Sequence, residues 1–471
     1  MQPYPPLGSL IAANCARQLG FEVELFDAML APSVDSWTEI VERFRPRFAI
    51  LYEDNFNYLS KMCLLRMREA GLEMAKVAKS LGATVIVCGA DATDHPDIYL
   101  ESGADFVLIG EGEDTLVELL QKLVGDSETS LESIPGLAFG STPARGITRT
   151  PPRDVIRELD RLPEPAWDLV DLARYRQVWK ERHGYFSLNL ATTRGCPYHC
   201  NWCAKPIWGQ TYHVRDVQAV AREMALLKDR FHVEHVWFAD DIMGLKPGWM
   251  TRFADAVEEG NCRLPFKCLS RADLVLRDGE VDALRRAGAK TVWIGAESGS
   301  QKILDAMDKG ITVEQIYQAN ERLRESGIKV GFFVQFGYPG EGVPEVEQTL
   351  KMVRECRPDE IGMSVSYPLP GTRFHEMVRE ELSQKQNWID SEDLEMLYQG
   401  PFGTDFYRCL YEVLHGEFAL RRHTTRIRRR KMAEWKLAAL RDLSAWGYRR
   451  LKLPWDRRRL GKLARRSQRG A

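Results

Sequence analysis

The stretch that decides the fold is Arg194–Ala204, which reads RGCPYHCNWCA. Its three cysteines, Cys196, Cys200 and Cys203, are spaced C-x3-C-x2-C and follow a strand-like run at residues 185–190. A short loop with this spacing can aim three thiolates at one centre. Soft thiolates at close quarters suit either zinc or an iron–sulfur cluster.

The number of cysteines separates these two kinds of site. Structural zinc takes four ligands, usually as two separated pairs, and the sequence has no second C-x2-C pair. His199 could complete a zinc site, but it lies inside the loop between two of the cysteines. A four-iron cluster can be held by three thiolates, which leaves one iron open to a further ligand. The count of three therefore favours a cluster over zinc, and over three structural thiols.

Length and composition set the broad class of the protein. The chain has 471 residues, 44% of them hydrophobic, which is enough for two to three domains with their own cores. It has no run of about 18 apolar residues, so we expect no membrane span. The first residues lack the charged and apolar regions of a secretory signal. Ten scattered cysteines are typical of reduced thiols, and we expect a cytoplasmic protein.

Residues 1–125 alternate helical and strand-like patterns. Strands are predicted at 22–26, 48–52, 84–88 and 106–109, and helices at 7–19, 37–44, 58–81 and 115–124. This alternation predicts a parallel, doubly wound sheet of the flavodoxin-like kind. Ligands of such sheets bind at the carboxyl ends of the strands. The candidate residues in the strand-end loops are Glu53, Gly89, Ala90, Asp91, Gly110, Glu111 and Gly112, although tight turns alone also explain their glycines.

Residues 185–382 form a second βα series. Six strands are predicted, and the six βα units resemble the partial (β/α)6 barrel of radical S-adenosylmethionine enzymes, whose site would lie at the carboxyl ends of the strands. For each polar residue at those ends, a helix cap is the alternative role. The predicted strands are 185–190, 234–238, 266–269, 291–295, 329–336 and 361–367, and the polar candidates after them are Asp240, Asp241, Ser270, Arg271, Glu297, Ser298, Tyr338, Tyr367 and His375.

Two further segments complete the chain. Residues 126–184 are a connector whose Pro-rich portions disfavour regular structure. Residues 383–471 are a helical, basic extension, in which residues 421–471 hold 19 Lys and Arg against 3 Asp and Glu. Basic side chains interleaved with aromatic ones could contact a membrane surface, a nucleic acid or an acidic protein. We favour a solvated appendage, then a membrane surface, and we do not expect nucleic acid.

The cysteine motif, with Trp202 as the aromatic residue before the last cysteine, resembles the signature of radical S-adenosylmethionine (SAM) enzymes. The resemblance implies a four-iron cluster at Cys196, Cys200 and Cys203, whose open iron binds SAM. One electron then splits SAM to a 5′-deoxyadenosyl radical, which abstracts hydrogen from a small-molecule substrate. It also implies an external electron donor of the flavodoxin or ferredoxin type. The cofactor carries the chemistry, and the protein positions it.

The same resemblance suggests how SAM would be bound. Asp240 or Asp241 would accept from its ammonium, and Arg271 would pair with its carboxylate. Glu297 or Ser298 would contact the ribose, because the run 295–300, GAESGS, resembles the fourth-strand motif of the elongator-like and methylthiotransferase-like branch. Trp202 and Ser270 join this expected SAM site by their positions.

The first domain resembles the cobalamin-binding domains that are fused to radical SAM barrels. The resemblance rests on four turns in the expected order: Pro5-Pro6-Leu7-Gly8, Gly89-Ala90, Gly103-Ala104-Asp105 and Gly110-Glu111-Gly112-Glu113. It implies that the strand-end candidates from Glu53 to Gly112 bind cobalamin. The D-x-H-x-x-G motif is absent, so no axial histidine is expected. The usual strand before the first turn is missing, and we expect the true start to lie upstream.

Three functions are compatible with these motifs. The leading hypothesis is a cobalamin-dependent radical SAM enzyme that methylates an unactivated carbon, with Tyr338, Tyr367 and His375 as candidate catalytic residues. The second is a radical SAM cyclisation or oxidative rearrangement, because the chain also resembles anaerobic porphyrin-ester cyclases. The third is a non-catalytic protein that binds a cluster or a corrinoid, and the intact cysteine trio argues against it.

Overall fold

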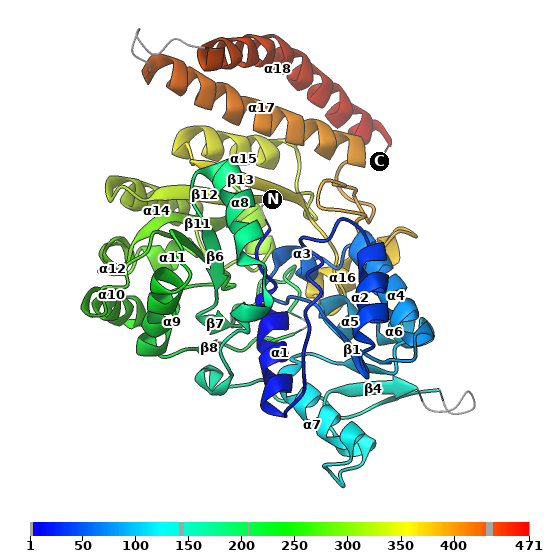
Figure 1. Ribbon diagram of the computed structural model, residues 1–471. Coiled ribbons are helices and arrows are strands. Elements are labelled where there is room, and N and C mark those ends of the chain that lie inside the picture. The colour runs from blue at the N-terminus through cyan, green and yellow to red at the C-terminus, as the bar shows by residue number, and fades with distance from the viewer. Residues whose placement is uncertain (1–2, 141–145, 206, 430–436, 471) are drawn as a thin grey trace.

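The computed structural model describes residues 3–140, 146–205, 207–429 and 437–470. Two α/β domains face each other, and a pair of long C-terminal helices lies along the outer side of the second domain (Figure 1). The fold class predicted from the sequence is confirmed, although several elements differ.

The N-terminal sheet has five strands in the order β1-β2-β3-β4-β5. The strands β1 (Phe48–Tyr52), β2 (Thr84–Cys88) and β3 (Phe106–Leu108) are parallel, as predicted. The strands β4 (Leu137–Gly140) and β5 (Ile147–Arg149) run antiparallel and come from the segment predicted to be an irregular connector. The sequence did not predict these two strands, and both contain no proline and so keep their ladder hydrogen bonds.

Helices cover both faces of this sheet. Successive residues of β2 point to opposite sides, so Val85 and Val87 pack under α2 (Asp35–Phe44) and α4 (Leu65–Ser80), while Ile86 and Cys88 pack under the other two helices. Those are α1 (Leu7–Gln18) and α7 (Glu113–Val124), which contact each other. The remaining elements of the domain are α3 (Tyr58–Lys61), α5 (Ala90–Asp94), α6 (Pro96–Glu101) and η1 (Leu131–Ser133).

Two predicted elements of this domain were wrong. Residues 22–26 are not a strand. In the described part of the chain they form no β-ladder with another strand, and the sheet begins at β1. The helix predicted over residues 58–81 is divided into α3 and α4. Cys63 adopts a left-handed backbone conformation at the break, where Met62 and Cys63 turn into the core shared with the second domain.

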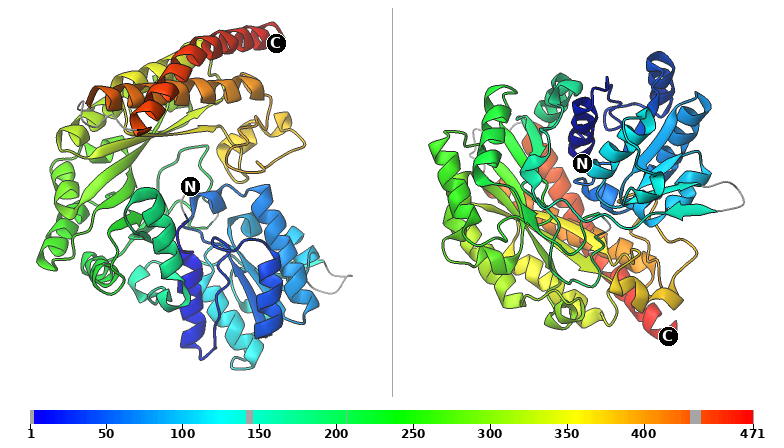
Figure 2. Two further views of the ribbon diagram at one scale, coloured as in Figure 1. Left: turned by 45° about the horizontal axis from the view of Figure 1, so that its top comes forward. Right: turned by 90° about the horizontal axis from the view of Figure 1, so that it is seen from below.

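The second domain is built on six parallel strands in sequential order, which confirms the predicted partial barrel. The sheet curls around one open side (Figure 2). Its strands are β6 (Ser187–Leu190), β9 (His235–Phe238), β10 (Phe266–Ser270), β11 (Ala289–Glu297), β12 (Lys329–Phe336) and β13 (Glu360–Val365). Its helices are α9 (Val217–Asp229), α10 (Trp249–Glu259), α11 (Ala272–Val275), α12 (Glu280–Ala287), α13 (Gln301–Ala306), α14 (Val313–Glu325), α15 (Val343–Cys356) and α16 (Arg373–Met377).

The segments around the first barrel strand frame the cysteine loop. The approach to β6 contains η2 (Leu159–Arg161), η3 (Trp167–Leu169) and α8 (Leu172–His183). A short antiparallel pair of strands, β7 (Thr193–Arg194) and β8 (His213–Val214), then brackets the loop from both sides.

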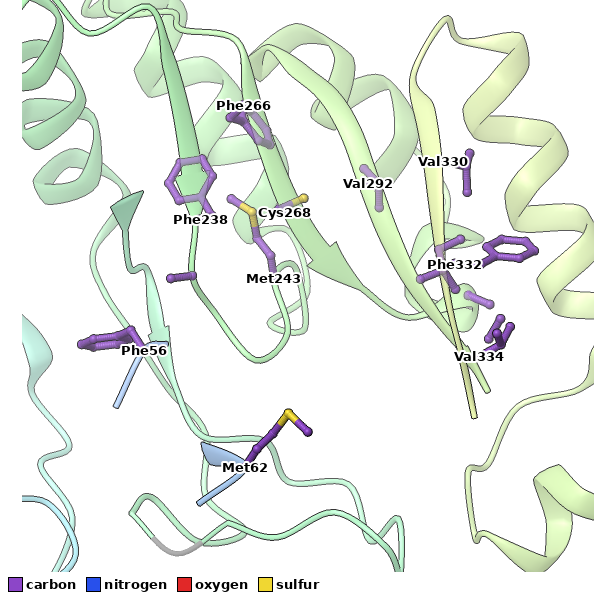
Figure 3. Close-up of a cluster of buried hydrophobic side chains, with 14 of the residues drawn as sticks. Phe56, Met62, Phe238, Met243, Phe266, Cys268, Val292, Val330, Phe332 and Val334 are labelled. Atoms are coloured by element: carbon purple, nitrogen blue, oxygen red, sulfur yellow. The ribbon is translucent and has the colours of Figure 1, made fainter. Parts of the chain in front are cut away.

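The two domains share one hydrophobic core. Phe56 and Met62 of the N-terminal domain belong to the same buried cluster as Phe238, Phe266 and the other inward residues of the barrel strands (Figure 3). Burying apolar surface across this boundary fixes the domains relative to each other, at roughly 25 cal/mol for each Å² removed from water.

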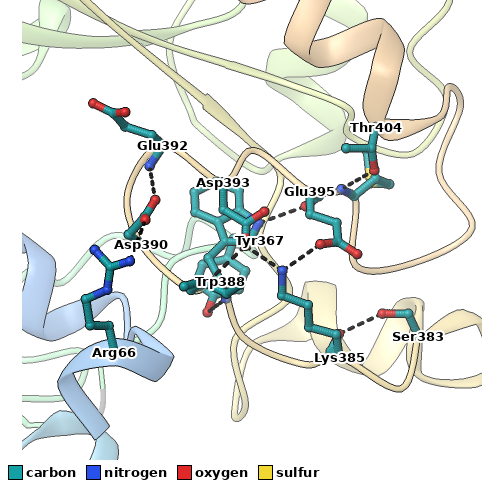
Figure 4. Close-up of polar contacts among 12 residues, drawn as sticks. Arg66, Tyr367, Ser383, Lys385, Trp388, Asp390, Glu392, Asp393, Glu395 and Thr404 are labelled. Atoms are coloured by element: carbon teal, nitrogen blue, oxygen red, sulfur yellow. Dashed lines mark hydrogen bonds and ion pairs between the residues drawn. The ribbon is translucent and has the colours of Figure 1, made fainter. Parts of the chain in front are cut away.

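After η4 (Arg379–Glu381), residues 382–403 fold back across the molecule toward the N-terminal domain. The backbone N–H of Leu65 donates to Trp388 O at 2.9 Å, and Arg66 pairs with Asp390. Tyr367 stacks on Trp388, and Lys385 bridges Asp393 and Glu395 (Figure 4). The sequence showed no motif for this segment.

The chain ends in an antiparallel pair of helices, α17 (Thr404–Arg429) and α18 (Leu437–Gly470). The helix α17 packs near β13, at the edge of the barrel sheet. Glu417 pairs both with Arg354 of α15 and with Arg457 of α18, which ties the three helices together. Among the described helices, none combines the length and the apolar character that a membrane span requires.

Candidate active site

The cysteine loop leaves β7 through a glycine that the geometry requires. Gly195 has φ +82°, and a Cβ atom there would collide with the carbonyl oxygen of Thr211. Beyond it, Cys196, Cys200 and Cys203 are reduced and half-buried. Burial raises the pKa of the Cys203 thiol to about 12, and Asp241, Cys200 and Cys196 lie near enough to contribute.

These three thiols are the residues that would hold an iron–sulfur cluster. Within the residues that the structure describes, no three His, Cys, Asp or Glu side chains converge tightly enough to hold one metal ion. An iron–sulfur cluster takes its thiolates on separate iron atoms and therefore spreads them apart. Burial also raises the pKa of the Cys196 thiol, and iron binding would keep Cys196 and Cys203 deprotonated despite this.

Asn201 holds the cysteine loop on the barrel. Its backbone N–H donates to Met307 O at 3.0 Å, and its side-chain Nδ2 donates to Ala306 O at 2.7 Å. Its Oδ1 accepts from the Tyr338 hydroxyl at 2.7 Å, and its carbonyl accepts from the backbone N–H of Phe374 at 2.9 Å. Every polar group of Asn201 is thus used to position the loop.

A cavity of about 490 Å³ opens beside the loop at the carboxyl ends of the barrel strands. Its charged lining side chains are Arg271, Lys309 and Arg373 against one acid, Asp308, and this excess of positive charge suits a ligand with a carboxylate. Its lining is Tyr198, His199, Cys200, Asn201, Cys203, Gln210, Arg271, Asp308, Lys309, Gly310, Gly371, Thr372 and Arg373.

Arg271 is placed on the cavity wall by its neighbours. Its Nε donates to Asp273 at 2.9 Å, its Nη2 donates to Lys309 O at 2.9 Å, and its guanidinium lies 3.5 Å from the centre of the Tyr198 ring. These contacts fix the plane of the guanidinium, which is what a bidentate pair with a carboxylate requires.

Glu297 reaches the same wall through a buried ion pair. It ends β11 with φ +55°, and its Oε1 accepts from Lys309 Nζ at 2.8 Å. Burial opposes the charge of Lys309, but the adjacent Glu297 carboxylate outweighs it and raises the pKa of this lysine. Lys309 was not among the residues predicted from the sequence, because it lies in a loop beyond α13 with no motif around it.

The two adjacent aspartates after β9 point in different directions. Asp240 is buried and accepts from the backbone N–H groups of Thr192 and Thr193 at 2.6 and 2.8 Å, so it fastens the β6 end to the β9 end. Burial raises its pKa to about 6. Asp241 is half-exposed and forms an ion pair with Lys61 of the N-terminal domain.

Several other sequence candidates have internal partners. Ser298 is fully buried and contacts Thr349 Oγ1 of α15 at 3.1 Å, and Ser270 Oγ donates to Met243 O at 3.3 Å. Trp202 is half-buried against the core, and its Nε1 has no acceptor in the part of the chain that the structure describes. An unpaired buried donor is costly, and Trp202 therefore suits a site that gains an acceptor when a ligand binds.

The three candidate catalytic residues do not meet at one point. The Tyr338 hydroxyl is engaged with Asn201, and the Tyr367 hydroxyl accepts from the backbone N–H of Trp388 at 2.9 Å. His375 lies in α16, with its Nδ1 at 3.4 Å from Glu376 Oε1. The two tyrosine hydroxyls are thus engaged within the protein, and a catalytic role for any of the three residues stays a prediction.

At the strand ends of the N-terminal sheet, close packing explains two glycines. A Cβ at Gly89 would collide with the Glu53 side chain, and one at Gly112 would collide with Cys88 Sγ. Burial raises the pKa of Glu53 to about 8, so this carboxyl is neutral at pH 7. The backbone N–H of Ala90 donates to it.

Asp91 is committed to the protein's own structure. Its carboxylate is held bidentately by Arg68, with Nε to Oδ2 at 2.7 Å, and it accepts from the Tyr99 hydroxyl at 2.8 Å. Arg68 also donates to Asn387 of the returning segment at 3.4 Å. Asp91 thus positions Arg68, and Arg68 contacts the returning segment.

Glu111 connects the edge of the N-terminal sheet to the cysteine loop through an ion pair. Together with Glu113 it pairs with Arg194, the residue that precedes Gly195, and all three side chains are buried. Glu111 also accepts from the backbone N–H of Ile156. Next to it, Gly110 has φ +76° and lies close to Ile207 O of the barrel domain. The sheet edge at Gly110 and Glu111 therefore faces the cysteine loop.

Comparisons with known proteins agree with this two-site geometry. Residues 190–353 match the model of the radical SAM superfamily, and residues 2–120 match the B12 binding domain. The chain belongs to the cobalamin-binding radical SAM family. It is an enzyme of that family, and its cofactors are a 4Fe-4S cluster, SAM and cobalamin. The first domain and the cysteine barrel are the two parts that the matches cover.

Individual relatives of this radical SAM enzyme carry different names. An uncharacterized methyltransferase of Pyrococcus horikoshii is 26% identical over 392 residues, which are 82% of this chain and 81% of the relative. An anaerobic magnesium-protoporphyrin IX monomethyl ester cyclase of Synechocystis is 28% identical over 333 residues, 69% of this chain and 63% of the cyclase.

A solved structure shares the fold. The radical SAM methyltransferase TsrM of Kitasatospora setae, with cobalamin and a 4Fe-4S cluster bound, superposes with a TM-score of 0.66. The identity is 19%, over 80% of this chain and 72% of that one.

Proposed function

We propose that this enzyme transfers a methyl group to an unactivated carbon of a small-molecule substrate. The observation that carries the proposal is the buried contact of Arg194 with Glu111 and Glu113, which joins the cysteine loop to the cobalamin-side sheet edge. The methyltransferase names of relatives support it, and a small substrate is supported by TsrM, which has been solved with tryptophan.

Within this proposal, Cys196, Cys200 and Cys203 hold the cluster. When bound, the cluster supplies the electron that cleaves SAM, and cobalamin supplies the methyl group. Asn201 holds the loop so that the three thiols keep their spacing. Gly195 lets the loop leave β7 without a clash.

SAM would bind in the cavity of about 490 Å³ beside the loop. Arg271 would take its carboxylate, because Asp273 and the backbone carbonyls of residues 309 and 310 already fix the guanidinium. Glu297, paired with Lys309, would accept from the ribose hydroxyls. Asp241 would pair with the ammonium group of SAM in place of Lys61. Asp240 is not free for this role, because its carboxylate accepts from backbone N–H groups.

On the other side, the sheet edge at Glu53, Gly89, Ala90, Gly110 and Gly112 would hold the corrin ring. Gly89 and Gly112 keep this edge closely packed on Glu53 and Cys88, so a substitution there would change its shape. The neutral Glu53 carboxyl is able to donate a hydrogen bond to an amide side chain of the corrinoid.

Radical cyclisation is the second candidate, because a relative named anaerobic magnesium-protoporphyrin IX monomethyl ester cyclase aligns over 69% of the chain. The two reactions use the same cofactors and differ in the mass of the product. Methylation adds one methylene unit to the substrate, whereas an oxidative cyclisation removes hydrogen.

Incubation of the anaerobically reconstituted protein with SAM, cobalamin, a strong reductant and candidate substrates tests the proposal. Methyl transfer is expected to release both S-adenosylhomocysteine and 5′-deoxyadenosine, because one SAM supplies the methyl group and another the radical. Release of 5′-deoxyadenosine alone, with a product that lacks the added methylene, would support cyclisation instead. Cys262→Ala, a substitution of a buried barrel cysteine outside the loop, is the matched control.

A further inference from the structure

The outward face of α18 carries a stripe of exposed apolar side chains. Tyr448, Leu451 and Trp455 are 63%, 82% and 60% exposed. Their spacing of three and four residues places them on one side of the helix. Aliphatic and aromatic groups exposed together in this way mark a contact surface.

Basic side chains continue the same face toward the C-terminal end of the helix. These residues are exposed and recur at helical spacing: Arg458, Arg459, Lys462, Arg465 and Arg466. The guanidinium of Arg459 lies 5.9 Å from the centre of the Trp455 ring, so positive charge and apolar surface adjoin.

The opposite face of α18 is already used for packing on α17. Asp456, Leu460 and Ala464 are buried, and the Cys409 thiol of α17 donates to Asp456 O at 3.5 Å. Lys452 pairs with Glu412 at 2.7 Å, and this pair keeps the two helices in register. The exposed stripe therefore lies on the side of α18 turned away from the residues that pack on α17. The helix lies on the outside of the molecule, beyond α17 and α15 (Figure 1).

We propose that α18 docks the enzyme on an anionic lipid surface. Helices that lie in a membrane interface combine Trp, Tyr and Leu with Lys and Arg in this manner. The apolar stripe would enter the headgroup region, and the basic residues would pair with lipid phosphates. The inference is independent of the reaction, since no residue of the stripe lines the cavity beside the cysteine loop.

The chemistry of the face favours lipid over two other partners. Nucleic acid would use the basic and aromatic groups, but an aliphatic residue such as Leu451 offers nothing for base stacking. A second copy of the chain would bring two basic faces together, and their repulsion opposes self-association.

Co-sedimentation of the full-length protein with lipid vesicles tests the proposal. We expect binding to vesicles of phosphatidylglycerol mixed with phosphatidylcholine, weak binding to phosphatidylcholine alone, and release by high salt. The double substitution L451E/W455E should weaken binding by about tenfold or more. The matched control is L81E, which changes an exposed leucine at the end of α4 in the other domain and should bind as the wild type does.

A second variant tests the electrostatic part. R458E/R459E/K462E keeps the apolar stripe and should weaken binding to the anionic vesicles by about tenfold or more. Melting temperatures of both variants near that of the wild type would show that the helix pair is intact. The proposal is overturned if the wild type does not bind anionic vesicles, or if L451E/W455E binds them as well as L81E does. It is also overturned if the stripe variant instead abolishes RNA binding or converts a wild-type dimer into a monomer.

Discussion

Arg194 Nη2 lies 2.8 Å from Glu113 Oε1 in a buried ion pair that crosses between the two domains. The same guanidinium also pairs with Glu111. Removing one partner of a buried ion pair leaves charge without compensation. This relationship connects the residue before the cysteine loop to the sheet edge proposed for cobalamin, and it makes the two sites depend on each other.

Arg194→Met is expected to destabilise the protein by about 3–5 kcal/mol, because two buried carboxylates lose their partner. Chemical denaturation measures the cost. Arg17→Met is the control, since Arg17 pairs with Asp168 at the surface and its loss should cost about 1 kcal/mol or less. Equal effects of the two substitutions would show that the Arg194 pair does not hold the domains together.

Asn201→Ala should release iron from the protein. It removes the hydrogen bonds to Ala306 O and Tyr338 that hold the loop, at about 1–2 kcal/mol. Iron content after anaerobic reconstitution is the measurement. Asn320→Ala removes a comparable buried bond to Cys356 O on the far side of the barrel, so it should cost similar stability and leave the iron content unchanged. Loss of iron from both variants would point to general unfolding.

Gly112→Ala is expected to weaken cobalamin binding and to cost about 1–3 kcal/mol of stability, because the added methyl group collides with Cys88 and Tyr52. Equilibrium binding of cobalamin measures the first effect. Gly140→Ala places a methyl group in open space on β4 and should change neither quantity. Wild-type cobalamin affinity in the Gly112 variant would place the corrinoid elsewhere.

Glu341 should make the protein less stable as the pH rises. Burial raises the pKa of this carboxyl from 4.5 to about 8, so the folded protein binds one more proton than the unfolded chain between these values. The contribution of Glu341 to the free energy of unfolding is therefore fully present near pH 4.5 and is lost as the pH rises toward 8. Glu341→Gln keeps a neutral group and should flatten the fall, by on the order of a few kcal/mol.

Thermal unfolding across pH 5 to 8 measures this effect. Glu345→Gln is the control, because the Lys302 ammonium lowers the pKa of Glu345 and its titration lies below this window. The melting temperature of the control should change with pH as that of the wild type does. If the melting temperature of Glu341→Gln also follows the pH dependence of the wild type, the account is contradicted.

The barrel was predictable from the sequence because each of its strands is a short apolar run followed by polar residues. The sequence also identified Cys196, Cys200 and Cys203 as one group, since three ligands within eight positions need no long-range contact. It failed for Glu22–Phe26, whose apolar residues resemble a strand but pair with no neighbour in the described sheet.

The partners of individual side chains were beyond sequence reasoning. Asp240 and Asp241 are adjacent, yet one turns to Thr192 and the other to Lys61 of the other domain. Arg194 and Glu111 are 83 residues apart, and only the docking of the two domains brings them together. Lys309 and the segment that returns to α4 carry no motif, because their roles arise from packing alone.

The central claim is that three cysteines hold a four-iron cluster that cleaves SAM. The most direct test is the yield of 5′-deoxyadenosine from SAM under a strong reductant, with the wild type compared with the single alanine variants of Cys196, Cys200 and Cys203. The account predicts 5′-deoxyadenosine from the wild type and from Cys262→Ala, and none from the three loop variants. Full activity in any loop variant, or no cleavage by an iron-loaded wild type, would contradict it.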